Sequence, residues 1–474
     1  MMISVCENRK VPCDARQRKE LKAFDDAWCS RFSKSTLFEW RHHEVWARNY
    51  VGVVQVPGLT LEILPKIDGG TGDAAVEKLL AQHNLLFMLS YTGNIPFEER
   101  ELAGLNLKKM PLMEVLLRLF ANRMMEDLRR GVDHAYVQME GNLSLVKGKI
   151  LMNRHLLVNA AHRERFHVGF DEFLDDTPLN RILKATCRRL TAVSKDPDTQ
   201  RSLMEATAVF DEVADILPDD HHFDRVHLHR NNERFQPLLD FCRLVWQGQS
   251  PNPSAGDCRT FSLLFPMEQL FEQFIAHFIR RHAGPFGFER SDVRIQSLSC
   301  TRFLLRDEAS GSLKFKLQPD LLIAKGKGIP QLILDTKWKR LKSDDEDRKN
   351  GVPQSDMYQM YAYANRYDCP DNVLLYPEVT GVTPKTYLLE DTSSAKRIRV
   401  AVISLSHDLS TVAGRAGFQI ALHEIIAVKA APAFKAPIER SIHGQVISGI
   451  SDAGTGTAAM YFECESTVQI EIAQ

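Results

Sequence analysis

The spacing of apolar residues divides the chain into stretches that predict strands and stretches that predict helices. Residues 50–67 (YVGVVQVPGLTLEILPKI) hold two runs rich in β-branched residues around a Pro-Gly turn, which predicts a β-hairpin. Residues 69–73 (GGTGD) end this β-rich part. From residue 74 the apolar residues recur every three or four positions, the period of an amphipathic helix. We therefore expect an N-terminal β-rich module, residues 1–73, followed by a mainly helical region, residues 74–246.

Within the helical region the pattern predicts several separate elements. The predicted helices cover residues 74–93, 112–131, 179–194, 201–217 and 234–246. Gly131 directly follows Arg129 and Arg130, a typical end of a helix. Residues 136–151 (YVQMEGNLSLVKGKIL) read as extended chain instead.

A change of composition marks the start of a second α/β pattern. Residues 247–257 (QGQSPNPSAGD) are rich in Gly, Pro, Ser and Asn, so we expect a linker over residues 247–260. Beyond it the pattern predicts a helix at 267–282, strands at 293–300, 313–324 and 331–339, a helix at 355–367, and strands at 372–378 and 397–405. This order predicts an α/β domain with a central mixed sheet, residues 261–430, and leaves residues 431–474 as an extension of unknown role. The expected fold class is a multidomain α+β protein.

Composition narrows the class without identifying the function. The 474 residues are 44% hydrophobic and 26% charged, which is ordinary for a soluble globular protein. The net charge of −1 means that any binding of nucleic acid needs a local patch or a partner. The nine cysteines contain no CxxC pair, there is no secretory signal, and no run approaches the roughly 18 apolar residues of a membrane span. We expect a cytoplasmic protein with no membrane partner.

The candidate chemistry lies in residues 317–341 (LQPDLLIAKGKGIPQLILDTKWKRL), where two strand-like runs carry Asp320 and Asp335. If the two strands are neighbours, both carboxylates converge, and Lys337 shares a face with Asp335. Converging carboxylates repel each other unless a cation lies between them, and oxygen ligands suit Mg²⁺. A lysine beside such an ion orients water or stabilises charge on a phosphate. The same sequence is also consistent with a purely structural hairpin, in which Asp320 lies in a turn and Asp335 forms an ion pair with Lys337 or Lys339.

Two helices add context to this cluster. The upstream helix offers Glu268 and Glu272 one turn apart on the same face. The downstream helix places Gln359 and Tyr363 four residues apart, again on one face. A tyrosine that merely packs on the sheet would give the same spacing.

The pattern PD-x14-D-x-K resembles the PD-(D/E)XK nuclease superfamily, and QxxxY at Gln359 and Tyr363 resembles its RecB-like branch. The resemblance implies a restriction-endonuclease-like domain that cuts DNA with Mg²⁺, or with Mn²⁺ as a substitute. It implies that Asp320, Asp335 and Glu272 hold the metal, with the carbonyl of Thr336 as a further ligand, and that Lys337 positions the attacking water. Gln359 and Tyr363 would support the lysine or contact DNA, and Lys339 and Arg340 would contact DNA phosphates.

Roughly residues 45–380 resemble the McrC family, the nuclease subunit of McrBC-type systems that restrict DNA containing 5-methylcytosine. The resemblance rests on the ordered motifs VGVVQVPGLTLEILPKI, NLSLVKGKI, FDEFLDDTPLNRILKAT, MEQLFEQFI, QPDLLI, LILDTKWK and DMYQMYAYA, and MEQLFEQFI favours Glu272 over Glu268. It implies a partner, a McrB-like AAA+ ring that binds GTP and reads the modified cytosine in double-stranded DNA. The N-terminal module and the helices to about residue 250 would contact that ring. The sequence has no GxxxxGK[ST] loop of its own.

Two other functions remain open at this point. One is a stand-alone RecB-like DNA nuclease of another defence or repair pathway. The other is a nuclease-dead subunit that only activates the GTPase.

Overall fold

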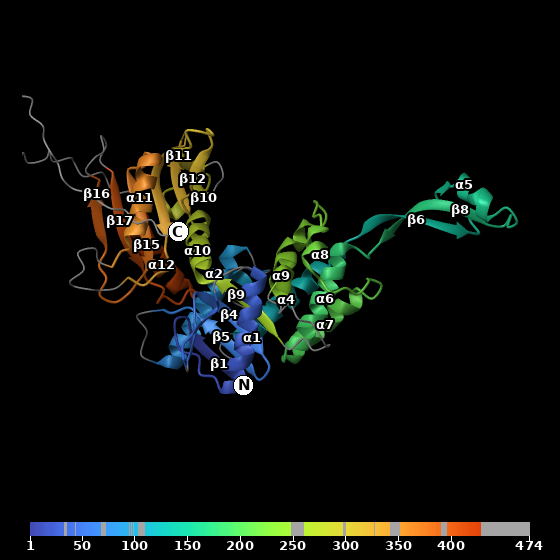
Figure 1. Ribbon diagram of the computed structural model, residues 1–474, viewed down its shortest axis with the longest axis horizontal. Helices are drawn as coiled ribbons and strands as arrows, with labels where there is room; N and C mark the ends of the chain where they lie inside the picture. The colour runs from blue at the N-terminus through green and yellow to red at the C-terminus, as the bar shows by residue number, and fades with distance from the viewer. Residues whose placement is uncertain are drawn as a thin grey trace, which may run out of the picture. The chain divides into compact units, whose positions relative to one another are not determined.

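The computed structural model describes residues 1–32, 36–42, 44–67, 73–93, 95, 97, 99–102, 110–247, 260–296, 300–326, 328–341, 351–389 and 396–427 (Figure 1). These residues belong to one compact unit, Met1–Ala431. Most of the predicted linker, residues 248–259, and the whole predicted extension, residues 431–474, lie outside the described residues. None of the described helices has the length and apolar character needed to cross a membrane.

The N-terminal sheet has four strands in the order β1 (Met2–Cys6), β5 (Leu59–Leu64), β4 (Tyr50–Val56) and β9 (Phe261–Pro266). β4 and β5 form the predicted hairpin, with Val56 opposite Leu59 across the Pro-Gly turn. Both strands are buried along almost their whole length because the sheet is covered on both faces. Val51 and Val53 of β4 pack in the large core with the helices of the middle region, while the alternate residues Val54 and Val56 pack in a smaller core.

The smaller core is closed by a helix that the apolar pattern did not predict, α1 (Ala15–Phe32). α1 contributes a narrow stripe of buried residues at helical spacing, Leu21 and Phe24, within an otherwise charged segment. A short hairpin, β2 (Phe38–Trp40) with β3 (Val45–Ala47), packs beside it. The N-terminal module is therefore β-rich as expected, but it is not all β.

The middle region is helical, and several of its helices begin at capping residues. Asp73 caps α2 (Ala74–Thr92), Thr177 caps α6 (Pro178–Val193) and Asp196 caps α7 (Pro197–Val209), the last two with proline at the first helical position. The remaining helices are α3 (Glu99–Leu102), α4 (Leu112–Leu128), α5 (Met152–Val158), α8 (Asp220–Asp224) and α9 (Gln236–Gln247). α7 ends well before the predicted residue 217. Beyond it the buried ammonium of Lys184 binds the carbonyl of Val213 at 2.5 Å, which fixes that segment in a non-helical path.

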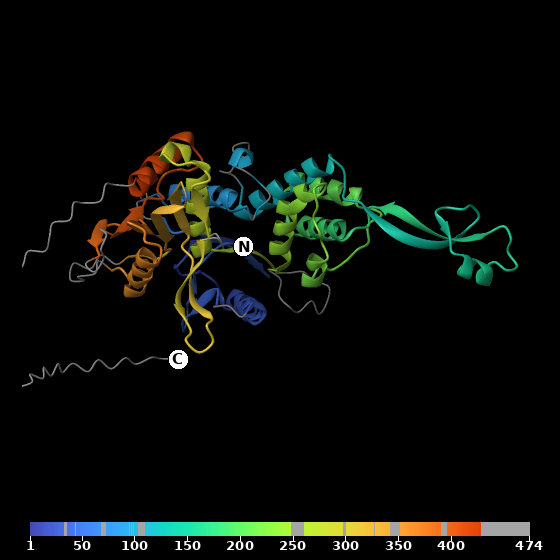
Figure 2. The ribbon, with the colours of Figure 1, turned by 90° about the horizontal axis from the view of Figure 1, so that it is seen from above.

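A ribbon projects from these helices in both views (Figures 1 and 2). It consists of β6 (Ala135–Leu143), β8 (Phe166–Leu174) and the short β7 (Lys149–Ile150), with α5 packed on β8. The extended chain predicted at 136–151 is present here. No residue of α5 is buried, and Leu156 and Leu157 are exposed to solvent.

The C-terminal half is built on a six-stranded mixed sheet, as the sequence predicted. Its order is β10 (Val293–Ile295), β13 (Leu321–Lys325), β14 (Ile329–Thr336), β15 (Asp371–Pro377), β17 (Arg397–Ile403) and β16 (Lys385–Leu388). β14, β15 and β17 are parallel, and the other pairs are antiparallel. α10 (Met267–Arg281) and α12 (Val412–Ile426) cover one face, and α11 (Gln354–Arg366) covers the other.

The strand predicted over residues 313–324 is in fact two strands. Its first part, β12 (Leu313–Leu317), leaves the sheet and, among the described strands, pairs with β11 (Arg302–Arg306) alone. The break falls at Gln318-Pro319-Asp320, because Pro319 has no N–H to donate to a sheet ladder. β13 begins at the next residue.

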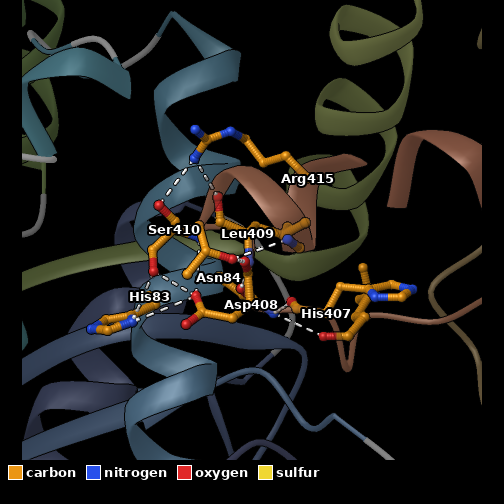
Figure 3. Close-up of polar contacts among 10 residues, drawn as sticks. His83, Asn84, His407, Asp408, Leu409, Ser410 and Arg415 are labelled. Carbon is orange, nitrogen blue, oxygen red and sulfur yellow. Dashed lines mark hydrogen bonds and ion pairs between the residues drawn. The ribbon is translucent and has the colours of Figure 1, made fainter. Parts of the chain in front are cut away.

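A shared sheet and a set of buried hydrogen bonds are among the contacts that join the C-terminal half to the N-terminal part of the chain. β9, the first strand after the predicted linker, completes the N-terminal sheet beside β4. The buried Asn84 of α2 donates hydrogen bonds to the carbonyls of Leu405 (2.8 Å) and His407 (2.9 Å) and accepts one from the backbone of Leu409 (2.9 Å) (Figure 3). The predicted division into domains stays a prediction, but the two parts share a sheet and this polar clamp.

Candidate active site

Asp320 and Asp335 meet at the ends of two paired strands. Leu321 lies opposite Leu334 in the β13–β14 ladder, so the next residues outward, Asp320 and Asp335, face each other. Both are nearly withdrawn from solvent, with 9% and 1% of their surface exposed. The backbone N–H and the hydroxyl of Thr336 donate to Oδ2 of Asp320 at 2.7 and 3.0 Å. The convergence expected from the sequence is therefore present.

Lys337 lies beside this pair. Its Nζ is 2.6 Å from Oδ2 of Asp335, and its side chain is only 15% exposed. The backbone N–H of Lys337 donates to the carbonyl of Leu375, which extends the β14–β15 pairing past the end of β14. The other oxygen of Asp335, Oδ1, is buried and has no hydrogen-bond partner among the described residues. One buried carboxylate oxygen is thus left for a group that the described residues do not supply.

α10 brings a third carboxylate to the cluster. Glu272 is half-buried beside Asp320, whereas Glu268, one turn earlier, is exposed. The side-chain amide of Gln296 donates to Glu272, and the backbone N–H of Gln296 donates to the carbonyl of Asp320. Gln296 therefore joins the helix to the strand, a role that no sequence pattern indicated. The choice of Glu272 over Glu268 agrees with this placement.

The proximity of these groups shifts their titration. Burial raises the pKa of Asp320 to about 7, with the neighbouring charge of Glu272 adding to the effect. Burial and then the charge of Asp320 raise the pKa of Asp335 to about 7. Burial also raises the pKa of Glu272. Burial opposes the charged form of Lys337, but Asp335 and Asp320 outweigh it and hold the lysine's pKa above its usual value. At the cluster one lysine, Lys337, faces three carboxyl groups, so a further positive charge would stabilise their ionised forms.

The donor set fits a hard divalent cation. Among the described residues no three side chains of His, Cys, Asp or Glu already form a closed metal cluster. The site nevertheless offers two carboxylates on adjacent strand ends, one of them with an unpaired buried oxygen, and a third carboxylate on α10. Mg²⁺ takes oxygen donors of this kind, because it binds through one or two carboxylates and keeps several waters. A cation at this point would also offset the repulsion that raises the carboxyl pKa values.

Gln359 and Tyr363 act on the backbone that leads into Asp320. The amide of Gln359 donates to the Tyr363 hydroxyl at 2.8 Å, and that hydroxyl donates to the carbonyl of Gln318 at 3.2 Å. One turn further on α11, the hydroxyl of Tyr367 donates to the carbonyls of Cys300 (2.6 Å) and Leu317 (2.9 Å). Tyr367 was not among the predicted site residues, although its position eight residues after Gln359 places it on the same helical face.

The residues after Lys337 are tied to other parts of the fold. Nζ of Lys339 lies 2.9 and 3.0 Å from the two carboxylate oxygens of the buried Asp356, so its predicted contact with DNA would compete with this ion pair. The indole N–H of Trp338 donates to Glu7 at 2.6 Å. Glu7 is 331 positions away, and burial raises its pKa to about 7. Arg340 lines a small pocket with Glu7, and its contact with DNA stays a prediction.

The six-stranded mixed sheet flanked by helices defines a mixed α+β protein, and this fold brings two aspartates, a lysine and a helical glutamate together. More specifically, the chain belongs to the family described as McrBC 5-methylcytosine restriction system component, whose model matches residues 45–377. No individually curated protein matches the chain.

Two solved structures are similar in fold. One is a chain of the refined half-complex from the tetradecameric assembly of Thermococcus gammatolerans McrB AAA+ hexamers with bound McrC, with 21% identity, a TM-score of 0.64, and coverage of 90% of this chain and 100% of that one. The other is a chain of the cryo-EM structure of the Thermococcus gammatolerans McrBC complex, with 23% identity, a TM-score of 0.51, and coverage of 60% of this chain and 88% of that one.

Proposed function

We propose that this protein is the nuclease subunit of a GTP-dependent, modification-dependent restriction complex, and that it hydrolyses phosphodiester bonds in DNA with Mg²⁺. The observation that carries the proposal is the meeting of Asp320, Asp335 and Lys337 at one sheet edge, beside Glu272. A structural hairpin would have no need to bury two aspartates with a bare carboxylate oxygen, because an unpaired buried charge destabilises the fold.

The roles of the residues follow from where they lie. Asp320 and Asp335 would hold Mg²⁺, or Mn²⁺ in its place, with Glu272 and the carbonyl of Thr336 as further oxygen donors. A bound divalent ion would polarise the phosphate and lower the pKa of a water. Lys337, kept charged by Asp335, would orient the attacking water and stabilise the charge that develops on the phosphate. Gln359 and Tyr363 would position Asp320 through the Gln318 carbonyl.

The proposed partner is a McrB-like AAA+ GTPase ring, because the similar structures are complexes of McrB AAA+ hexamers with bound McrC. GTP would be bound by that ring and not by this chain. The substrate would be double-stranded DNA carrying modified cytosine, and the complex would act in the cytoplasm. We place the contact with the ring on the N-terminal module, residues 1–73, and on the helical region. Exposed apolar side chains on α5, which packs on the β6–β8 ribbon, support a protein contact in the helical region; Leu156 and Leu157 are two of them.

The test is DNA cleavage by the assembled complex with the ring, GTP and Mg²⁺. Asp335→Asn and Glu272→Gln should each reduce cleavage by about a hundredfold or more, since each removes charge from the proposed metal site. Glu268→Gln is the matched control, because Glu268 is exposed on the same helix one turn away. Cleavage by Asp335→Asn at the parent rate would refute the proposal.

The two alternatives give different outcomes in the same assay. Cutting by the chain alone, without ring or GTP, would favour a stand-alone RecB-like DNA nuclease. Stimulation of GTP hydrolysis with no cleavage by the parent chain would favour a nuclease-dead activator. The intact Asp320, Asp335 and Lys337 count against the second.

A further inference from the structure

The β11–β12 ribbon has a surface that the fold does not use. It pairs with no other strand among the described residues, and an isolated two-stranded ribbon is only marginally stable in water. Apolar side chains on it face solvent, including Leu305 and Phe315, the latter 67% exposed. Phe315 also has a φ of 57°, a backbone conformation that a bulky residue rarely adopts. Packing among the described residues explains neither feature.

The base of the ribbon is fixed firmly to the candidate active site. The Tyr367 hydroxyl donates to the carbonyls of Cys300, just before β11, and of Leu317, at the end of β12, so it holds both strands at the base of the ribbon. The guanidinium of Arg366 donates to the carbonyl of Phe303 at 2.8 Å. Leu317 ends β12 only three residues before Asp320. The same face of α11 that positions Asp320 therefore also fixes where the ribbon lies.

The strands of the ribbon carry positive charge. Four exposed basic residues lie on them: Arg302, Arg306, Lys314 and Lys316. The two arginines bind carbonyl oxygens of the chain itself, whereas no hydrogen bond or ion pair of the Lys314 or Lys316 ammonium groups occurs among the described residues. The two lysines are two positions apart, so they share one face of β12, opposite Leu305 and Phe303 of β11.

We propose that the β11–β12 ribbon is a DNA-binding element that lies in a groove of the duplex beside the bond to be cut, with Lys314 and Lys316 on backbone phosphates. A two-stranded ribbon has the width that the major groove admits, and lysines supply the phosphate contacts that set position. The occupant is nucleic acid because the strands present cations next to a site built for phosphate chemistry. This inference rests on the proposed function, and it adds an element that would hold the duplex in register with Asp320.

The test measures DNA affinity as a function of salt for the complex with the ring. A labelled, modified duplex is titrated in EDTA with a non-hydrolysable GTP analogue, so that binding is read without cleavage. Lys314→Gln/Lys316→Gln should lower the slope of log K against log salt by about 2, since each lost phosphate contact contributes about 0.9. The control, Arg280→Gln/Lys385→Gln, removes two exposed charges of the C-terminal half, one at the end of α10 and one on β16, and should leave the slope unchanged.

Further variants and outcomes keep folding and function apart. Lys314→Arg/Lys316→Arg should restore the slope, and thermal unfolding should match the parent. If the salt slope of the Lys314→Gln/Lys316→Gln variant equals that of the parent, the inference is overturned. If that variant also fails to assemble with the ring, the β11–β12 ribbon is a protein contact instead. If the parent complex itself binds no DNA, the proposed function fails first and the ribbon assignment fails with it.

Discussion

The replacement Asp320→Asn should stabilise the protein at alkaline pH while it abolishes cleavage. Asp320 is a buried carboxyl whose pKa is raised to about 7 by burial and by Glu272. An asparagine has nearly the same shape and can still accept the hydrogen bonds from Thr336. The variant therefore removes a buried charge without emptying space in the core.

The sign follows from proton binding. Because the folded pKa lies above the unfolded value, the native state binds the proton more tightly, and stability falls as pH rises from about 4 to about 7. A difference of roughly 3 pKa units corresponds to at most about 4 kcal/mol, and between pH 5 and pH 8 to about 2–3 kcal/mol. Glu272 and Lys337 account for part of this effect. We therefore expect the stability of Asp320→Asn relative to the parent to be about 1–3 kcal/mol greater at pH 8 than at pH 5.

The assay is denaturant unfolding of parent and variant at both pH values in EDTA, repeated with Mg²⁺. Mg²⁺ should stabilise the parent at pH 8 by mass action and leave the variant nearly unchanged. A pH-independent difference, or a variant less stable than the parent at pH 8 in EDTA, would refute the reasoning about the buried carboxyl. A Mg²⁺ effect of equal size on both proteins would place the ion elsewhere.

Four further variants test the fold and the site. Lys337→Gln should lower the cleavage rate of the complex by about a hundredfold at saturating Mg²⁺, and a rate within about threefold of the parent would remove Lys337 from the chemistry. Gly52→Ala should destabilise the fold by more than about 2 kcal/mol in denaturant unfolding, because its Cβ would lie 2.0 Å from the carbonyl oxygen of Leu263 at a φ of 127°. Gly58→Ala, at a φ of 80° but in open space, should cost only about 1 kcal/mol. Asn84→Ala should cost about 3 kcal/mol, since it leaves three backbone groups without their buried partner, and hydrogen exchange at Leu409 should speed up.

The local pattern was enough to predict β14 and the meeting of Asp320, Asp335 and Lys337, although it merged β13 with β12 into one strand. Strand periodicity and a short turn determine which side chains of neighbouring strands lie together, so a short stretch of sequence is enough to predict this contact. The α1 helix escaped the same reasoning because its buried stripe is narrow and its remaining residues are charged.

The contacts that were missed join residues far apart in the sequence. Trp338 and Glu7 meet across 331 positions, and Gln296 reaches Glu272 only once β10 has paired with β13. The pairing of β9 with β4 likewise depends on Gly52, whose missing side chain lets the two backbones approach. A single sequence holds no direct record of such distances.

The position of β9 has a practical consequence for dissecting the protein. A fragment that begins at residue 261 would start with β9, whose buried Phe261, Leu263 and Phe265 have β4 as their neighbour in the intact chain. Without β4, this apolar strand would expose an open edge, which recruits other chains and favours aggregation. α10, which follows β9 directly and carries Glu272, would also lose the hydrogen bond that the backbone N–H of its first residue, Met267, donates to the carbonyl of Asn49. The catalytic half is therefore best produced together with the sheet that closes it.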